Sequence, residues 1–308
     1  MGTERLWQEA LQAAGEHGWQ ARVVAVDRLG EARRRVGDAL AAAGLPAATA
    51  DHVAAQVAFA LPASPSRPRS VVVGAVARPL TQASLSRHGT VHTVPVPPHY
   101  AGYYRVPGEL VAALRPVLSA AGHEVEGFAP PLKTLAAGAG LARYGRNAIA
   151  SVPGLGSYLL LAACVTDAEP PADAAWGEPL PLERCEDCRA CAAACPSGAI
   201  RAHGFSLRTH RCLTMANEDR APFPGWVRPN WHHCAVGCLR CQMACPENAA
   251  VALVVEPPEL FDEAETAAIM AAAPSSTLPA ATRAKLARCG LDYSPDLIAR
   301  NLGALIGA

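Results

Sequence analysis

The sequence is poor in lysine, in aromatic residues and in excess charge of either sign. Only Lys133 and Lys285 are lysines among its 27 basic residues, and aromatic residues make up 5% of the 308 positions. Its 27 acidic residues balance the basic ones, so the composition shows no electrostatic preference for nucleic acid or an anionic membrane surface. We therefore expect a small-molecule partner, uncharged or of mixed charge, and we do not expect a nucleic-acid partner.

Long apolar runs are also missing. Even the stretch over residues 158–165 is much shorter than the ~18 residues that a transmembrane helix needs. Residues 3–14 have the apolar stripe of an amphipathic helix with Thr3 as its expected N-cap, and they lack the basic head and apolar core of a secretory signal. We therefore expect a cytoplasmic protein with no membrane segment.

The first 168 residues alternate helical and strand-like patterns. The strand-like runs lie at 21–26, 70–76 and 158–165. A helix is predicted over 107–121, where apolar residues recur on one side. This alternation predicts an α/β domain with a mixed sheet over residues 1–168.

Two further regions follow. Residues 169–252 begin with a proline-rich linker and contain nine of the eleven cysteines. Residues 253–308 show three helical patterns, at 261–273, 280–288 and 295–306, with Ser294 as the expected N-cap of the last one. The predicted fold class is therefore α+β or mixed α/β: an N-terminal α/β domain, a cysteine-rich domain and C-terminal helices.

The first cysteine motif is the string CEDCRACAAACP. It places Cys185, Cys188, Cys191 and Cys195 in the C-x2-C-x2-C-x3-C-P spacing of bacterial ferredoxins. In that arrangement three thiolates bind one [4Fe-4S] cluster and the fourth binds a second cluster. The second cluster is expected at CLRCQMACP, where Cys238, Cys241 and Cys245 repeat the last three positions of the motif.

The second motif lacks its first cysteine, because position 235 is alanine, so either Cys212 or Cys234 must complete the set. The crossed pattern gives a first set of Cys185, Cys188, Cys191 and Cys245. The second set contains Cys195, Cys238, Cys241 and one of those two. Structural zinc also binds four cysteines, but its motifs normally pair two C-x2-C knuckles without this overlap. Cys164 and Cys289 are expected to be buried small hydrophobic residues.

Electrons from two clusters need an acceptor, and no dinucleotide-binding motif is present, because GAGLARYG at 138–145 has the wrong glycine spacing. The set GLARYGRNAI, GSYLLLAACVTD, the cysteine run, HRCLT and NWHHCAVGCLRCQMACPEN resembles the epoxyqueuosine reductases and their relatives the reductive dehalogenases. The resemblance spans about residues 100–308. It implies that the N-terminal domain is of a corrinoid-binding type, with a base-off cobalamin held between it and a ferredoxin-like double-cluster domain. The clusters would reduce the cobalt.

The resemblance also implies site residues. It favours Cys212 over Cys234 as the remaining ligand of the second set, because family members have a cysteine in that position. It places Gly140, Gly145 and Asn147 against the corrinoid, where glycines permit close backbone approach and the asparagine can hydrogen-bond the corrinoid amides. Ser157 is either a further cofactor contact or a residue that starts a strand.

A proton donor is needed beside the cobalt. Epoxyqueuosine reductases carry an aspartate shortly before the glycine motif, but this sequence has Gly127 near that position and Glu126 beside it. The dehalogenase branch uses a tyrosine, and HYAGYYR at 99–105 offers three. Tyr104 is our first candidate for the catalytic donor and Glu126 the second.

These observations predict a cobalamin-dependent iron–sulfur reductase that removes a leaving group or an oxygen atom from a small organic substrate. Ferredoxin or flavodoxin would donate the electrons. One alternative is an electron-transfer iron–sulfur protein without a corrinoid. Another is an epoxyqueuosine reductase that acts on transfer RNA, which the missing aspartate and the neutral net charge disfavour.

Overall fold

A computed structural model describes residues 2–55, 59–205, 207–249, 251 and 253–307. The chain forms two compact units, and each unit combines two segments. Unit 1 contains residues 1–77 and 104–188, and unit 2 contains residues 78–103 and 189–308. This division differs from the three consecutive regions expected from the sequence, because residues 78–103 leave the N-terminal region and join the C-terminal one.

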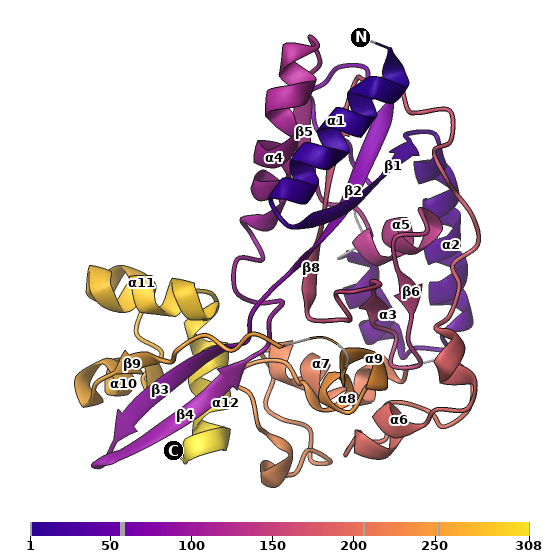
Figure 1. The fold of residues 1–308 in the computed structure, drawn as a ribbon. Coiled ribbons are helices and arrows are strands. Elements are labelled where there is room, and N and C mark those ends of the chain that lie inside the picture. Colours follow the sequence, from indigo (N-terminus) through magenta and orange to yellow (C-terminus); the bar gives the residue numbers. More distant parts are fainter. Residues whose placement is uncertain (1, 56–58, 206, 250, 252, 308) are drawn as a thin grey trace. The chain divides into compact units, whose positions relative to one another are not determined.

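Unit 1 is built on a four-stranded sheet (Figure 1). Its strands are β1 (Trp19–Ala25), β2 (Ser70–Ala77), β5 (Val125–Phe128) and β8 (Leu159–Thr166). The three longer strands lie where the sequence predicted them. The order is β1-β2-β8-β5 and every pair is antiparallel, so the expected mixed sheet is wrong. Sequence periodicity located the strands, but it does not specify their partners, and β8 inserts between β2 and β5.

Helices cover both faces of this sheet. The helices of unit 1 are α1 (Thr3–Glu16), α2 (Arg28–Ala42), α3 (Ala47–Ala55), α4 (Val106–Ala120) and α5 (Leu132–Gly138). Trp7 and Leu110 belong to the core on the α1/α4 face, whereas Leu29 and Leu135 belong to the core on the α2/α5 face. Two short strands, β6 (Arg143–Tyr144) and β7 (Ala150–Ser151), pair with each other.

The predicted cap of α1 is wrong. Thr3 is the first residue of the helix, and Gly2, which has no side chain, occupies the N-cap position. The helix predicted over 107–121 is confirmed as α4, which contains Pro116. Cys164 is fully buried in the centre of β8, as expected, and burial raises the pKa of its thiol to about 12.

Unit 2 contains a three-stranded sheet that the sequence analysis missed. Its strands are β3 (Thr81–Arg87), β4 (Thr90–Val96) and β9 (Glu259–Phe261), in the order β4-β3-β9. Strand β9 pairs in parallel with β3, although the two are far apart in sequence. This pairing explains why the hairpin of residues 78–103 belongs to the C-terminal unit.

Three helices pack on the inner face of that sheet: α10 (Glu263–Met270), α11 (Ala280–Cys289) and α12 (Pro295–Ile306). Helix α10 begins at Glu263, later than predicted, because Asp262 and Glu265 form a capping box. Ser294 is the N-cap residue of α12 and Pro295 follows it at the first helical position, as expected, but the Ser294 side chain makes no capping hydrogen bond. Its Oγ instead accepts a hydrogen bond from Arg220 at 3.2 Å. Cys289 is fully buried, as expected.

The cysteine-rich segment has little regular structure. Its helices are α6 (Ala190–Ala194), α7 (Leu213–Glu218), α8 (Arg240–Met243) and α9 (Pro246–Ala249). Short 3-10 turns lie at Glu183–Glu186, Thr209–Arg211 and Pro229–Trp231, with another at Ser275–Thr277 near the C-terminus. Among the described residues, we find no helix with the length and apolar character to cross a membrane.

Candidate metal centre and cofactor site

The predicted second set of cysteines lies entirely in unit 2. Helices α6 and α8 pack together there, so the two cysteine motifs meet. Cys195, Cys212 and Cys238 lie close enough to interact electrostatically. Burial, followed by the charges of Cys212 and Cys195, raises the pKa of the Cys238 thiol to about 11. This proximity of thiols supports the assignment of these three residues to one cluster.

The thiol of Cys195 accepts several hydrogen bonds from neighbouring residues. Burial alone would raise the pKa of its thiol. Hydrogen bonds from Ser197, including its hydroxyl at 3.5 Å, and from the backbone N–H groups of Ala199 and Ile200 outweigh that effect and lower the pKa. Donors of this kind stabilise a thiolate, which is the form that binds iron.

Cys212 and Cys234 differ in exposure. Cys212 is half-buried at the start of α7, whereas Cys234 is 1% exposed. Burial and the charge of Cys238 raise the pKa of Cys234 to about 12, which favours a protonated thiol. Both cysteines lie near Cys238, so either could be the remaining ligand of the second set. Cys195 and Cys212 both interact electrostatically with Cys238, which supports Cys212.

The first predicted set is divided between the two units, with Cys185 and Cys188 in unit 1 and Cys191 and Cys245 in unit 2. Cys185 and Cys191 are buried and the other two are half-buried. Among the described residues, no three His, Cys, Asp or Glu side chains are grouped to hold a single metal ion. Both sets of cysteines therefore stay predictions that rest on the motifs.

Arg146 organises the part of the first set that lies in unit 1. Its backbone N–H donates to Cys185 Sγ at 3.5 Å, its Nε donates to the carbonyl oxygen of Cys188 at 3.2 Å, and its Nη2 donates to the carbonyl oxygen of Cys185. The Arg146 residue is 3% exposed, so its positive charge is buried beside these cysteines. Arg146 lies within the motif GLARYGRNAI, but no local pattern in the sequence predicts its contacts with the cysteines.

The residues on either side of Arg146 are the predicted corrinoid contacts Gly145 and Asn147. They form a tight turn in which the amide N–H of Gly145 donates to Ile149 O at 2.9 Å and Asn147 Oδ1 accepts from the Ile149 N–H at 3.2 Å. A Cβ at position 145 would lie 2.5 Å from Asn147 Oδ1, so any other residue there would force the Asn147 side chain to shift. Asn147 Nδ2 has no protein partner within the described residues, and its contact with a corrinoid amide stays a prediction.

Gly140 and Ser157 both lie in turns of unit 1. Gly140 has a φ of 67° directly after the end of α5, where its amide donates to Ala137 O, a position that favours glycine. Ser157 is half-buried in the turn before β8. Their contacts with a cofactor stay predictions.

The two candidate proton donors lie in different surroundings within unit 1. Glu126 lines a pocket of about 410 Å³ between α4 and the edge strand β5, together with Arg115 and Gly127. A Cβ at Gly127 would meet Pro107 at 3.5 Å, an ordinary contact, so a side chain fits there. Tyr104 is 78% exposed and does not line this pocket. The geometry supports Glu126 over Tyr104.

A carboxylate with two tyrosines in unit 2 also escaped the sequence analysis. The hydroxyl of Tyr100 donates to Glu218, and Tyr293 donates to the same carboxylate at 3.3 Å. Burial raises the pKa of Glu218 and holds that of Tyr100 well above its usual value. The Tyr100 ring packs on Gly237, beside Cys238, where a Cβ would lie 2.6 Å from its hydroxyl. No spacing rule connects these residues, so only the fold reveals them.

Comparison with known proteins identifies the cysteine-rich segment. Residues 184–248 match the family model of the 4Fe-4S double cluster binding domain. Epoxyqueuosine reductase from Synechococcus sp. (strain RCC307) is 37% identical over 122 residues, which are 38% of this chain and 34% of that protein. The enzyme from Bacillus subtilis (strain 168) is 30% identical over 117 residues, 38% of this chain and 28% of that protein. The matched region thus spans about a third of these curated relatives.

Solved structures extend the likeness to the whole fold. Epoxyqueuosine reductase from Bacillus subtilis, with its catalytic aspartate loop swung out of the active site, aligns with a TM-score of 0.67 and 18% identity over 99% of this chain and 82% of its own. An epoxyqueuosine reductase with an epoxyqueuosine-modified tRNA-Tyr stem loop aligns with a TM-score of 0.66 and 17% identity over the same shares. The chain therefore has the mixed α and β fold of these proteins.

Proposed function

We propose that this chain, a relative of the epoxyqueuosine reductases that carries a 4Fe-4S double cluster binding domain, is an iron–sulfur and cobalamin-dependent reductase. One observation carries the proposal: Arg146 hydrogen-bonds two cysteines of the first set, while its neighbours Gly145 and Asn147 are the predicted corrinoid contacts. A single turn of unit 1 would thus touch both a cluster and the corrinoid. When bound, cobalamin would supply a strongly reducing cobalt centre.

The protein groups have separate tasks in this proposal. The eight thiolates hold two clusters, which carry one electron at a time. Arg146 fixes the loop of Cys185 and Cys188, and its buried charge favours the reduced state of the cluster beside it. Asn147 Nδ2 orients the corrinoid, and Gly145 lets the backbone approach it closely.

Epoxyqueuosine in transfer RNA is the first substrate to test, ahead of a small organic molecule. The named relatives support this choice, and one was solved with a modified tRNA stem loop. The neutral net charge argued against nucleic acid, but it is a sum over the whole chain.

Glu126 is the proposed proton donor in place of the missing aspartate. Removing an epoxide oxygen as water consumes two electrons and two protons, so an acid must deliver a proton near the substrate. Glu126 lines the pocket beside Gly127, and no hydrogen-bond or ion-pair partner for its carboxyl exists among the described residues. Glu126 is exposed on the edge strand β5, so its carboxyl is open to a substrate that enters this pocket.

The experiment is anaerobic turnover of the reconstituted protein with dithionite as reductant. Epoxyqueuosine-modified tRNA and the free epoxyqueuosine nucleoside are compared, and loss of the epoxide oxygen is followed by mass spectrometry. Turnover of tRNA alone supports the transfer-RNA substrate, and equal turnover of the nucleoside supports a small substrate. If neither substrate reacts while both clusters and corrinoid are present, the reaction assigned here is wrong.

The donor is tested separately with Glu126→Gln. We expect turnover to fall about a hundredfold, in the usual range for a general acid, with substrate affinity retained. The control is Glu16→Gln, which changes an exposed carboxyl on α1. Full activity in Glu126→Gln would remove Glu126 from the mechanism and leave the reductase assignment intact.

A further inference from the structure

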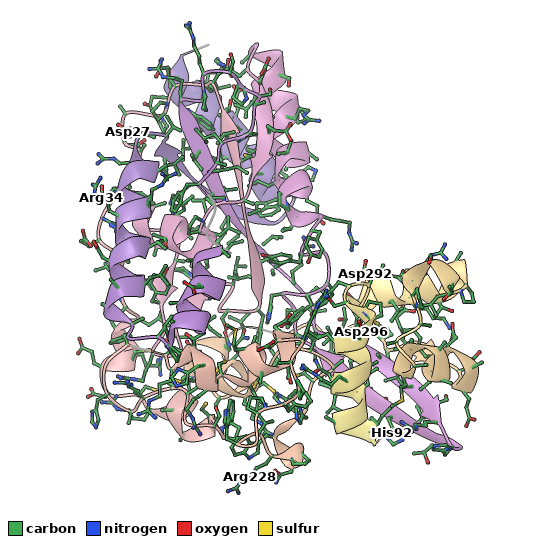
Figure 2. The ribbon with its side chains drawn as sticks, turned by 180° about the vertical axis from the view of Figure 1, so that it is seen from behind. Asp27, Arg34, His92, Arg228, Asp292 and Asp296 are labelled. Atoms are coloured by element: carbon green, nitrogen blue, oxygen red, sulfur yellow. The ribbon has the colours of Figure 1, made fainter. Side chains whose placement is uncertain are left out.

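Unit 2 presents an exposed basic surface beside the second set of cysteines. We define it as the arginine–tryptophan face: Arg201, Arg208, Arg211, Trp226, Arg228 and Trp231. Arg201, Arg208 and Arg228 are exposed, and none of them pairs with an acidic side chain in the part of the chain that the structure describes. Figure 2 shows Arg228 extending from its loop into solvent.

The two segments that form this face are held together by contacts within unit 2. The amide of Arg208 donates to Ala199 O at 2.9 Å, which closes a small hairpin. The guanidinium of Arg211 lies 5.0 Å from the ring centre of Trp226, so the hairpin contacts the loop of residues 220–231. In that loop Arg228 lies over Trp231 at 5.7 Å. These stacks order two of the arginines before any partner binds.

The face also adjoins the predicted second cluster. Cys212 follows Arg211 directly and is half-buried. Arg211 Nε donates to Ser197 O at 3.2 Å, and Ser197 in turn hydrogen-bonds Cys195. On the other side, Arg240, which lies between Cys238 and Cys241, donates to Trp231 O at 3.4 Å. Three of the four proposed ligands are therefore within a few residues of the surface arginines.

We propose that the arginine–tryptophan face is the docking surface for an acidic, low-potential, one-electron carrier protein. The inference rests on the proposed function, because it requires a cluster at the second set. One electron leaves the reduced carrier and reduces that cluster, and no bond forms or breaks. Opposite charges guide the two proteins to the orientation that brings the carrier's redox centre over Cys212.

The same surface chemistry could attract RNA, but two observations favour the protein carrier. Single-stranded RNA is normally recognised by aromatic faces on which bases stack, whereas Trp226 and Trp231 each have an arginine over the ring. The arginines also surround a cluster ligand, where RNA would have no chemical task. Electron-transfer complexes, in contrast, use small charged patches next to a redox centre.

The test uses the reconstituted holoprotein in anaerobic stopped flow, with a reduced acidic two-cluster ferredoxin as the probe. The variant is Arg208→Glu/Arg228→Glu. The matched control is Arg34→Glu, an exposed arginine of α2 that pairs with no acidic side chain in the described part of the chain (Figure 2). We expect the second-order rate of cluster reduction to fall at least about tenfold in the variant and less than about twofold in the control. The wild-type rate should also decrease with ionic strength.

Two further readouts separate the possible outcomes. Reduction and turnover with dithionite should be the same in the variant and the wild type, and failure of both proteins in this assay contradicts the proposed function. If ferredoxin reduces the variant at the wild-type rate, the proposed docking surface is wrong, and the proposed function is unaffected. If, in addition, the variant no longer binds a tRNA stem loop, the arginine–tryptophan face is an RNA-binding surface and the docking proposal is wrong.

Discussion

Cys185 and Cys188 of the first predicted set, in unit 1, and Cys195 of the second set, in unit 2, lie in different electrostatic surroundings. In unit 1 the buried guanidinium of Arg146 donates to the carbonyl groups of Cys185 and Cys188. In unit 2 Cys195 receives hydrogen bonds from the neutral Ser197 and from backbone N–H groups. A fixed positive charge favours a reduced cluster more than neutral donors do. The first cluster should therefore have the higher potential, so that electrons run from the second cluster towards the corrinoid.

The largest effect is expected from removing the guanidinium group of Arg146. Arg146→Ala leaves the carbonyl groups of Cys185 and Cys188 without their side-chain donor, so we expect about half of the iron to be lost. We also expect a decrease of about 3 kcal/mol in the free energy of unfolding, as for other buried charged hydrogen bonds. Iron analysis and urea denaturation measure both.

The control for that variant is Arg143→Ala in the same motif. Arg143 pairs with Glu183, whose side chain is 86% exposed. Loss of a surface ion pair of this kind costs less than about 1 kcal/mol and no iron. Equal effects in the two variants would contradict the special position of Arg146.

The second largest effect concerns the ligand of the second set. We expect Cys212→Ser to halve the iron content, because an alcohol does not replace a thiolate on iron. Cys234→Ser should keep all the iron, since Cys212 lies with Cys195 near Cys238 while Cys234 is 1% exposed. The reverse result would assign Cys234 to the cluster.

A smaller effect is expected at Cys195, whose hydrogen-bond donors are neutral. Ser197→Ala removes one hydrogen bond to Cys195, worth about 1 kcal/mol, which corresponds to roughly 40 mV for a one-electron couple. The potential of the second cluster should fall by at most that amount, because both oxidation states lose the hydrogen bond and the more negative reduced state loses more stabilisation. A potentiometric titration followed by electron paramagnetic resonance measures it, and Ser197→Thr should restore the wild-type potential.

The smallest effect is a pH dependence in unit 2. Burial raises the pKa of Glu218 in the folded protein above its value in the unfolded chain. The stability linked to this group is therefore complete below the ordinary pKa of glutamate and is lost as the pH rises through the raised value. Glu218→Gln should remove this dependence, so its stability relative to wild type should increase with pH across that window. A constant difference between the two proteins would show that Glu218 titrates normally.

The sequence predicted the parts of the molecule that have strong local patterns. The apolar runs gave β1, β2 and β8, and the helical stripes gave α4, α11 and α12. The hairpin β3–β4 escaped because its strands are largely polar, for example TQASLSR. Its pairing with the three-residue strand β9 is non-local and leaves no periodic signal.

The candidate site was also predictable only where its residues form a local sequence motif. Cysteine spacing is a property of the motif, so the ligand sets could be listed from sequence. Whether Glu126 or Tyr104 lines a pocket depends on how β5 lies against α4, which a single sequence does not encode locally. The role of Arg146 likewise depends on a contact across about 40 residues, which no spacing rule describes.

The most direct test of the account is the stoichiometry of its cofactors. The protein is purified without oxygen, loaded with hydroxocobalamin and freed of the excess, and then iron, corrinoid and the paramagnetic resonance spectrum are measured after partial reduction. The account predicts two [4Fe-4S] clusters per chain, with one retained corrinoid that gives a base-off cobalt signal. Two clusters without any retained corrinoid would contradict it and would indicate an electron-transfer protein.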